Sequence, residues 1–141
     1  METDETIKKG FLRLERYAQN IPGGFHCCAE DPENGYPFAY VSDRFLEILG
    51  WEREEFAARF DNRYTALIHP DDLAAGLRYR NAENSATYAK NGDSIFRILG
   101  KNGYRWVTNA ANQVEWYGKG YIVGTITDIT PYMELREKLE Q

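Results

Sequence analysis

Cysteine is scarce in this sequence, and its placement excludes two kinds of site. The 141 residues contain two cysteines, Cys27 and Cys28, which are adjacent. Adjacent cysteines cannot form an ordinary disulfide with each other or join distant segments, so the sequence indicates no disulfide framework and fits a reducing compartment. Since a zinc site needs about four ligands and the chain has no other cysteine, we also expect no metal site.

An excess of positive charge is also absent. The 17 Lys and Arg residues are outnumbered by 22 Asp and Glu, which gives a formal net charge of -5. Nucleic-acid-binding domains usually concentrate Lys and Arg on one face, so we expect no DNA or RNA partner. The sequence has no apolar run near the roughly 20 residues of a membrane span, and its polar start has no signal-peptide pattern. We therefore expect a cytoplasmic protein that makes no membrane contact through this segment.

The residues that are present predict a single domain with a substantial core. Hydrophobic residues make up 43% of the chain and aromatic residues 14%, which is too apolar for a disordered chain. The 28% of charged residues is ordinary for a folded domain. A chain of this length buries about two thirds of the surface that it exposes when unfolded.

The order of periodic segments predicts an α+β fold with an antiparallel sheet. Apolar residues at spacings of three and four predict helices, and alternation predicts strands. The segments "KNG" and "YGKG" have the composition of tight turns between strands. The predicted elements are a helix at 6–20, strands at 25–29 and 38–41, helices within 43–91, and strands at 94–100, 104–114 and 121–129.

Several residues mark the ends of the middle helices. Ser42 is a candidate N-cap, and Gly50 a candidate end, of the first of these helices. "HPDD" begins a third helix, so we interpret His69 as part of a helix start and not as a ligand.

The predicted elements divide the chain into an amphipathic N-terminal helix at 1–21, a core at 22–130 and the start of a C-terminal helix at 131–141.

Four segments in sequence order resemble the signature segments of a PAS domain: "FAYVSDRFLEILGWEREEF", "LIHPDD", "ILGKNGYRWV" and "GTITDIT". Together they cover about residues 24–130. The resemblance implies a five-stranded antiparallel sheet in the order 2-1-5-4-3, with helices over one face and flanking N- and C-terminal helices. It is strongest to the bacterial sensory box type found upstream of histidine kinase or diguanylate cyclase modules, which implies two-component or cyclic-di-GMP signalling.

The last strand leads directly into the C-terminal helix. Thr130 is a candidate cap, Pro131 suits the first helical position, and an apolar seam of Tyr132, Leu135 and Leu139 is typical of a coiled-coil start. The resemblance implies that Asp128, Ile129 and Thr130 form a joint that passes a signal to a covalently linked output domain, in a homodimer. The alternative is a terminal helix that packs back on its own sheet.

Strand alternation assigns side chains to the two faces of the sheet. By resemblance to flavin-binding relatives, the face of Ile126 lines the pocket, which leaves Trp106 on the outer face for the N-terminal helix or a dimer partner to cover. By apolarity alone, the face of Trp106 is the better core face, so both faces are candidates for burial. The predicted ligand-binding residues are His26, Cys28, Phe45, Phe96, Ile98, Val107, Asn109, Gln113 and Ile126.

No motif identifies a cofactor, which stays unknown. The segment "ARFDNRYTALIHP" matches the helix that carries the reactive cysteine in photochemical flavin domains, but it contains no cysteine. The segment that supplies the axial histidine in haem-binding relatives contains no histidine here. His26 and Cys28 share one face of their strand and Cys27 has the other, and we interpret both cysteines as buried and structural, with redox sensing as the alternative.

Three functions remain open from the sequence. The first is a sensor that binds a small metabolite, with Asn109 and Gln113 as its polar contacts. The second is a ligand-free dimerisation and relay module whose core is filled by its own side chains. The third is a small α+β enzyme, for which no catalytic triad spacing, phosphate loop or carboxylate pair stands out. We expect a sensor module and no enzyme.

Overall fold

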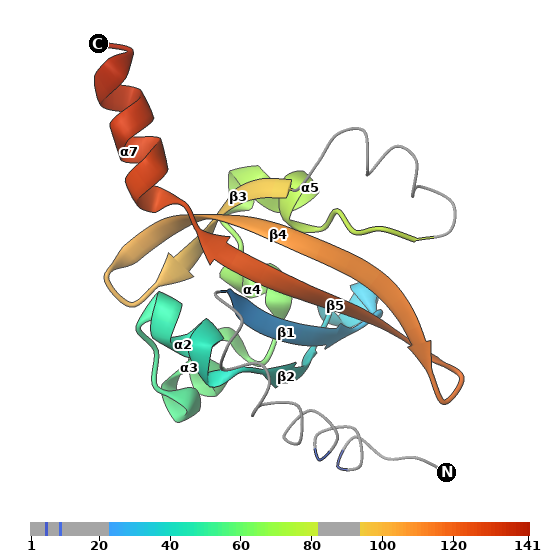
Figure 1. Cartoon of the computed structure of the whole chain (residues 1–141). Coiled ribbons are helices and arrows are strands. Elements are labelled where there is room, and N and C mark those ends of the chain that lie inside the picture. Colours follow the sequence, from blue (N-terminus) through green and yellow to red (C-terminus); the bar gives the residue numbers. More distant parts are fainter. Residues whose placement is uncertain (1–4, 6–8, 10–22, 82–93) are drawn as a thin grey trace.

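The computed structural model describes residues 5, 9, 23–81 and 94–141. Five strands form one antiparallel sheet in the order β2-β1-β5-β4-β3 (Figure 1). This order and the α+β class confirm the prediction. The predicted N-terminal helix at 6–20, with its covering of Trp106, lies outside the described residues. The strands are β1 (Gly24–Ala29), β2 (Phe38–Val41), β3 (Ser94–Gly100), β4 (Gly103–Trp116) and β5 (Lys119–Asp128).

The three C-terminal strands are joined by the two predicted tight turns. Between β4 and β5, Tyr117 and Gly118 have φ angles of 54° and 75°, and positive φ at both central residues is the type I′ pattern that matches strand twist. The other turn joins paired residues Gly100 and Gly103. The long β5 therefore lies in the middle of the sheet, paired with β1 on one side and β4 on the other.

Apart from a short helical turn, η1 (Pro32–Asn34), between β1 and β2 and a C-terminal helix after β5, the helices lie between β2 and β3 in the sequence. The helix starts at Ser42 and His69 and the end at Gly50 are as the sequence predicts. Ser42 Oγ accepts a hydrogen bond of 3.2 Å from the Phe45 N–H at the start of α2, and Gly50 ends that helix with a φ of 82°. His69 Nδ1 accepts from the Asp71 N–H at 3.1 Å, which confirms a helix start at this histidine. The elements are η1 (Pro32–Asn34), α2 (Asp43–Leu49), α3 (Arg53–Phe60), α4 (Tyr64–Leu67), η2 (Pro70–Asp72) and α5 (Leu73–Gly76).

The predicted third helix ends earlier than its sequence indicates. α5 stops at Gly76, and the next four residues, Leu77–Arg80, which we call the strap, are not helical. The Arg80 N–H donates to the Ala111 carbonyl at 2.8 Å, and the Gln113 N–H donates to the Arg80 carbonyl at 2.7 Å. Among the described residues, β3 pairs with β4 as far as Asn109, and the strap pairs with β4 beyond it. This tertiary pairing outweighs helix propensity.

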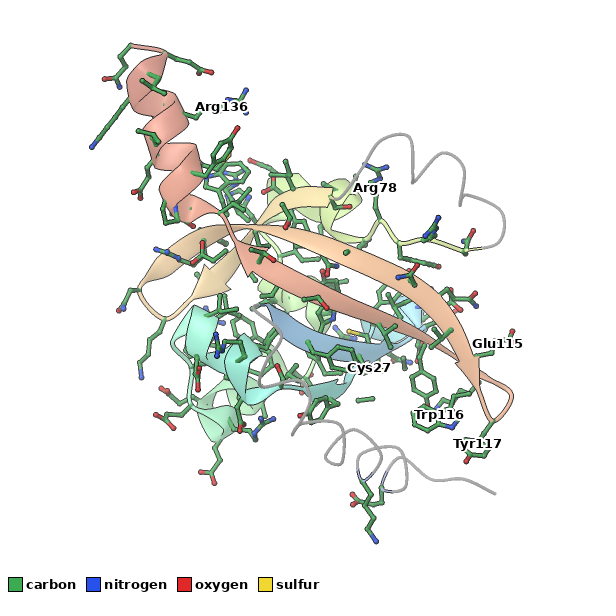
Figure 2. The ribbon with its side chains drawn as sticks, in the orientation of Figure 1. Cys27, Arg78, Glu115, Trp116, Tyr117 and Arg136 are labelled. Carbon is green, nitrogen blue, oxygen red and sulfur yellow. The ribbon has the colours of Figure 1, made fainter. Side chains whose placement is uncertain are left out.

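Both faces of the sheet bury apolar side chains, so the second face was correctly identified as a candidate. The main core, between the sheet and the helices, includes Phe45, Phe96, Ile98, Val107 and Ile126, each at most 1% exposed. A smaller cluster on the other face contains Cys27, Tyr40 and Tyr121. Figure 2 labels Cys27 near β1 and Trp116 near the β4–β5 turn, and Trp116 packs against this cluster. Cys27 and Cys28 are both buried, but in different clusters.

Trp106 lies half-buried on the outer face of β4, as alternation predicts. The Arg97 guanidinium carbon is 5.0 Å from the centroid of the Trp106 ring, a distance typical of a cation–π contact. No pattern in the sequence indicates this contact. Arg97 is held in place by Asp72, whose carboxylate accepts from its Nε at 2.8 Å.

The C-terminal helix, α7 (Thr130–Leu139), projects away from the sheet (Figure 1). Its seam residues Tyr132, Leu135 and Leu139 are 61%, 57% and 78% exposed. In this chain the seam therefore does not pack back on the sheet. Within the described residues, none of the helices combines the length and apolar character that crossing a membrane requires.

Candidate functional site

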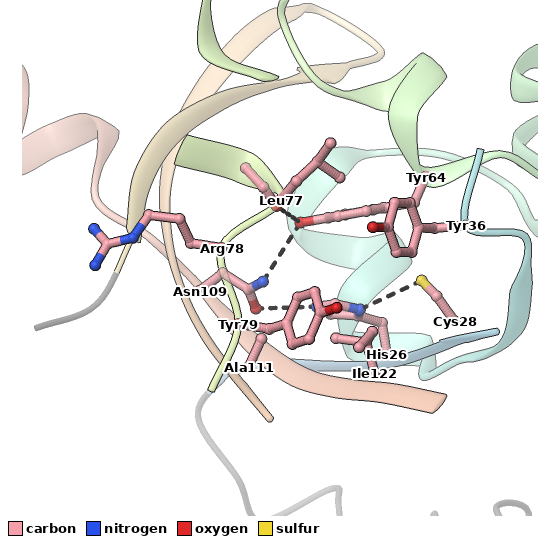
Figure 3. Close-up of a pocket in the computed structure, with 11 residues that line it drawn as sticks. His26, Cys28, Tyr36, Tyr64, Leu77, Arg78, Tyr79, Asn109, Ala111 and Ile122 are labelled. Carbon is pink, nitrogen blue, oxygen red and sulfur yellow. Dashed lines mark hydrogen bonds between the residues drawn. The ribbon is translucent and has the colours of Figure 1, made fainter. Parts of the chain in front are cut away.

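A small cavity lies between the inner face of the sheet and the segments that cover it (Figure 3). The sheet contributes His26 and Cys28 from β1, Asn109 and Ala111 from β4, and Ile122 from β5. The cover consists of Tyr36, Tyr64, and the run from Gly76 to Tyr79. The cavity offers only about 10 Å³ to the centre of a water molecule, which is about the room for one water.

A continuous chain of hydrogen bonds crosses this cavity. His26 Nε2 lies 3.0 Å from Asn109 Oδ1, and Asn109 Nδ2 donates to Tyr64 Oη at 3.4 Å. Tyr64 Oη in turn donates to the Gly76 carbonyl at 3.1 Å. Since Asn109 presents its oxygen to His26, the His26 proton is on Nε2. Nδ1 is then the acceptor that faces Cys28 Sγ at 4.0 Å, and the chain ends at the residue that precedes the strap.

Gly124 makes room for the His26–Asn109 hydrogen bond of this chain. It is paired with His26 in the sheet. A Cβ atom at this position would lie 2.7 Å from Asn109 Oδ1 and 2.8 Å from His26 Nε2. Any larger residue on β5 would therefore displace the imidazole, the amide or the strand itself.

Burial keeps His26 and the two cysteines neutral. Desolvation lowers the pKa of His26 to about 4, against a smaller opposing effect of its hydrogen bond to Asn109. Burial raises the pKa of Cys28 well above its ordinary value, and raises the pKa of Cys27 to about 12. Because the thiolate is the reactive form and the metal ligand, neither thiol is activated near neutral pH.

The structure brings together three of the nine predicted ligand-binding residues, His26, Cys28 and Asn109, at the cavity. Phe45, Phe96, Ile98, Val107 and Ile126 lie in the main core behind it. Gln113 is half-buried outside the cavity lining, where its Nε2 donates to Glu30 Oε1 at 3.0 Å.

Residues of the cover were missed by the sequence analysis. Tyr64 stacks on His26 with ring centroids 5.4 Å apart, and Tyr79 belongs to the strap that was predicted as helix. Alternation locates side chains within a sheet but says nothing about the segments packed against it. Tyr79, the one aromatic residue among residues 77–80, is the only signal in the sequence for a segment packed over the cavity.

The joint between β5 and α7 differs from its prediction. The helix begins with Thr130 itself, so Pro131 is its second residue, and the first helical N–H donates to Asp128 Oδ1 at 2.9 Å. Thr130 Oγ1 accepts from the Trp106 N–H at 2.8 Å and does not cap the helix. The ladder between β4 and β5 ends at Val107 and Asp128, so the Trp106 backbone is open to these contacts.

Asp128 is the charged centre of the joint. Its Oδ2 accepts from Arg105 Nη2 at 2.8 Å and Nε at 3.0 Å. Burial opposes ionisation of Asp128, but hydrogen bonds from Thr130 and Arg105 outweigh it and hold its pKa below the ordinary value. The Ile129 N–H also donates to the Trp106 carbonyl at 2.8 Å. β4 and the first turn of α7 are thus connected by several short bonds.

Metal binding has no support within residues 5, 9, 23–81 and 94–141. No three side chains of His, Cys, Asp or Glu in this part of the chain gather closely enough to hold an ion.

Comparisons with known proteins agree with the fold. A family model described as the PAS fold matches residues 38–126. A sensory box histidine kinase/response regulator from Burkholderia thailandensis is 22% identical with a TM-score of 0.56, over 91% of this chain and 92% of that one. An RNA-binding light-oxygen-voltage receptor is 18% identical with a TM-score of 0.61, over 94% and 36%. The PAS domain of the fruit-fly ELK potassium channel is 17% identical with a TM-score of 0.53, over 85% and 97%. The search of curated proteins gave no match.

Proposed function

This chain belongs to the PAS-fold family, and we propose that it is the sensory and signal-relay module of a larger signalling protein. The module binds a small ligand in the cavity beside His26 and Asn109. Ligand binding displaces β5, and this displacement reaches the joint at Asp128, Ile129 and Thr130. From there α7 passes it to a covalently linked output domain in a homodimer.

The observation that carries this proposal is the path of β5. Ile122 lines the cavity, Gly124 lies against the His26–Asn109 hydrogen bond, and Asp128 is the charged centre of the joint. The five residues from Gly124 to Asp128 span only about 14 Å of strand. A ligand that displaces the Asn109 amide moves a strand whose end is bonded to the first turn of α7.

The chemistry of the cavity indicates what kind of ligand fits. His26 Nε2 donates, while the Asn109 amide and the Tyr64 hydroxyl both donate and accept. A small neutral molecule with a carbonyl or amide group replaces these bonds without burying a charge, which the apolar surroundings would penalise. Since the space present is about that of one water, binding requires the cover to move.

The ligand-free relay is the second candidate, and the small cavity favours it. If the core is permanently filled by its own side chains, the same joint transmits a change that arrives from elsewhere in the dimer. The two candidates share the relay and differ only in whether a small molecule binds.

Native mass spectrometry of the purified chain under mild conditions separates them. The sensor predicts a bound small molecule at one per chain, which Asn109→Leu abolishes because it removes the polar contact from the cavity. Asn112→Leu is the matched control, since Asn112 is exposed on the same strand. If neither co-purification nor titration with small amides gives a bound mass, the ligand-free relay is the correct reading.

A further inference from the structure

The strap closes the cavity on the side away from the sheet. Leu77, Arg78 and Tyr79 are three of its lining residues. In Figure 3 the Arg78 side chain extends away from the other residues, while the Tyr79 ring lies over the His26 and Ala111 side. Any molecule that enters from the strap side must displace the Tyr79 ring.

The Glu30 carboxylate holds this ring by a hydrogen bond. The Tyr79 hydroxyl donates to Glu30 Oε2 at 2.7 Å, a short bond to a charged acceptor. The other oxygen of Glu30 accepts from Gln113 Nε2 at 3.0 Å. Burial raises the pKa of Tyr79, and the hydrogen bond to Glu30 raises it further, so the hydroxyl stays a donor at neutral pH. Glu30 thus connects the strap to β4 across the rim of the cavity.

Gly120 on β5 provides the space for this carboxylate. A Cβ atom at this position would lie 2.5 Å from Glu30 Oε1. The Glu30 N–H donates to the Gly120 carbonyl at 3.0 Å, which fixes the backbone beside it. A methyl group at position 120 would therefore move the end of a flexible side chain and leave the backbone largely in place.

We infer that Glu30 is the latch residue of the cavity: its hydrogen bond to Tyr79 holds the strap closed, and breaking that bond admits small molecules to His26, Cys28 and Asn109. The inference rests on the proposed function for the identity of what enters, whereas the latch itself can be tested without a ligand. It assigns control of access to the rim contact between Glu30 and Tyr79.

Cys28 is a built-in reporter for this latch because its thiol lines the cavity. In a Cys27→Ala background, the rate at which a small reagent such as methyl methanethiosulfonate modifies Cys28 measures strap opening. Tyr79→Phe removes only the hydroxyl, and Gly120→Ala displaces the carboxylate from a different element. Loss of a hydrogen bond to a charged group predicts at least about a tenfold faster reaction in each variant. The two changes combined should add little, because both release one latch.

Two controls separate the latch from general loosening. Tyr117→Phe removes an exposed hydroxyl from the β4–β5 turn and should leave the Cys28 rate unchanged. Amide exchange should accelerate at Arg80 and Gln113 but not at Ile126 in the core. An unchanged Cys28 rate in Tyr79→Phe and Gly120→Ala overturns the latch, and so does an equal acceleration at Ile126.

The result is distinguishable from failure of the proposed function. Unchanged labelling in a protein that carries a bound small molecule overturns the latch and leaves the sensor intact. Faster labelling in a protein that binds no small molecule supports the latch and overturns the sensor.

Discussion

The middle of β5 and its C-terminal end are held by different kinds of interaction. Beside Gly124, the strand meets a cavity in which neutral groups, His26, Asn109 and Tyr64, share hydrogen bonds of 3.0–3.4 Å. At Asp128, the same strand is held by a guanidinium and a helical amide at 2.8–3.0 Å. Charged hydrogen bonds are shorter and roughly twice as strong as neutral ones.

Under the proposed function, this difference assigns one role to the part of β5 beside the cavity and another to the part at the joint. Neutral bonds at the cavity can be exchanged for those of a small polar molecule at little net cost. The charged joint keeps its geometry and transmits a displacement of the strand instead of absorbing it. A sensor needs both properties within one rigid element, and β5 is the element that contains them.

The largest expected effect tests whether stability resides on the cavity side and not in α7. Leu49 in α2 is 3% exposed, and Leu139 in α7 is 78% exposed. Leu49→Ala should lower the free energy of unfolding by about 2–5 kcal/mol, because it removes buried contacts and leaves a cavity. The same substitution at Leu139 should change it by less than about 0.5 kcal/mol. Urea unfolding of both variants measures this, and equal losses would contradict the comparison.

As the pH falls, the stability contributed by the cavity should be lost at a higher pH than the stability contributed by the joint. The pKa of His26 is 6.5 when exposed and about 4 in the fold, so between these values the unfolded chain binds a proton that the folded chain does not. Stability from neutral His26 is complete above pH 6.5 and is lost as the pH falls to 4, by about 3 kcal/mol in total. Asp128 has a pKa below its ordinary 3.8, so its contribution is lost only at lower pH.

Urea unfolding between pH 7 and pH 4 measures this loss. His26→Gln should flatten the dependence on pH in this range. His69→Gln is the matched control, because His69 lies at the start of η2, away from the cavity, and this variant should keep the dependence. An unchanged slope in His26→Gln would show that protonation elsewhere controls acid stability.

The sequence predicted the sheet better than it predicted the cover of the cavity. The inward positions of Phe96, Ile98 and Val107 follow from a period of two, which leaves no choice once one face is assigned. The strap could not be predicted, because its pairing with β4 depends on where β3 stops, and residues 77–80 have ordinary helix propensity. Latch residue Glu30 lies in a polar loop, where no pattern predicts a partner 49 residues away.

At the joint, too, the local sequence suggests candidate residues, but strand pairing decides which contacts they make. Asp128 and Thr130 are both plausible caps in the sequence, and the choice depends on the last residue pair of the β4–β5 ladder. Because that ladder ends at Asp128, its carboxylate receives the helical amide and the Thr130 hydroxyl turns to Trp106. The position of the transition from β5 to α7 could be predicted, but not which of Asp128 and Thr130 accepts the helical amide.

The smallest expected effect concerns the Thr130 hydroxyl. Thr130→Val keeps the shape of the side chain and removes the bond to the Trp106 N–H, which should cost about 1 kcal/mol. Amide exchange should accelerate at Trp106 while the exchange of Gly124 stays constant. Faster exchange at Gly124 as well would indicate that the part of β5 beside the cavity and the part at the joint do not behave as separate regions.

The central claim is that displacement at Gly124 reaches an output domain through the joint. In a fusion of this chain through α7 to a histidine kinase domain, Gly124→Ala forces a methyl group against the His26–Asn109 bond and imitates an occupied cavity. It should change autophosphorylation at least about fivefold, the low end of ordinary coupling between sites. Two glycines inserted after Thr130 should abolish this change, because they add slack between β5 and α7.

The same insertion after Tyr117, in the β4–β5 turn, provides the control and should preserve the effect of Gly124→Ala. The measurement is therefore the ratio of autophosphorylation rates with Gly124 and with Ala at position 124, in each insertion background. The account predicts a ratio near one only when the glycines follow Thr130. An effect of Gly124→Ala that persists through the insertion after Thr130 would contradict it and would show that the signal leaves the domain by another route.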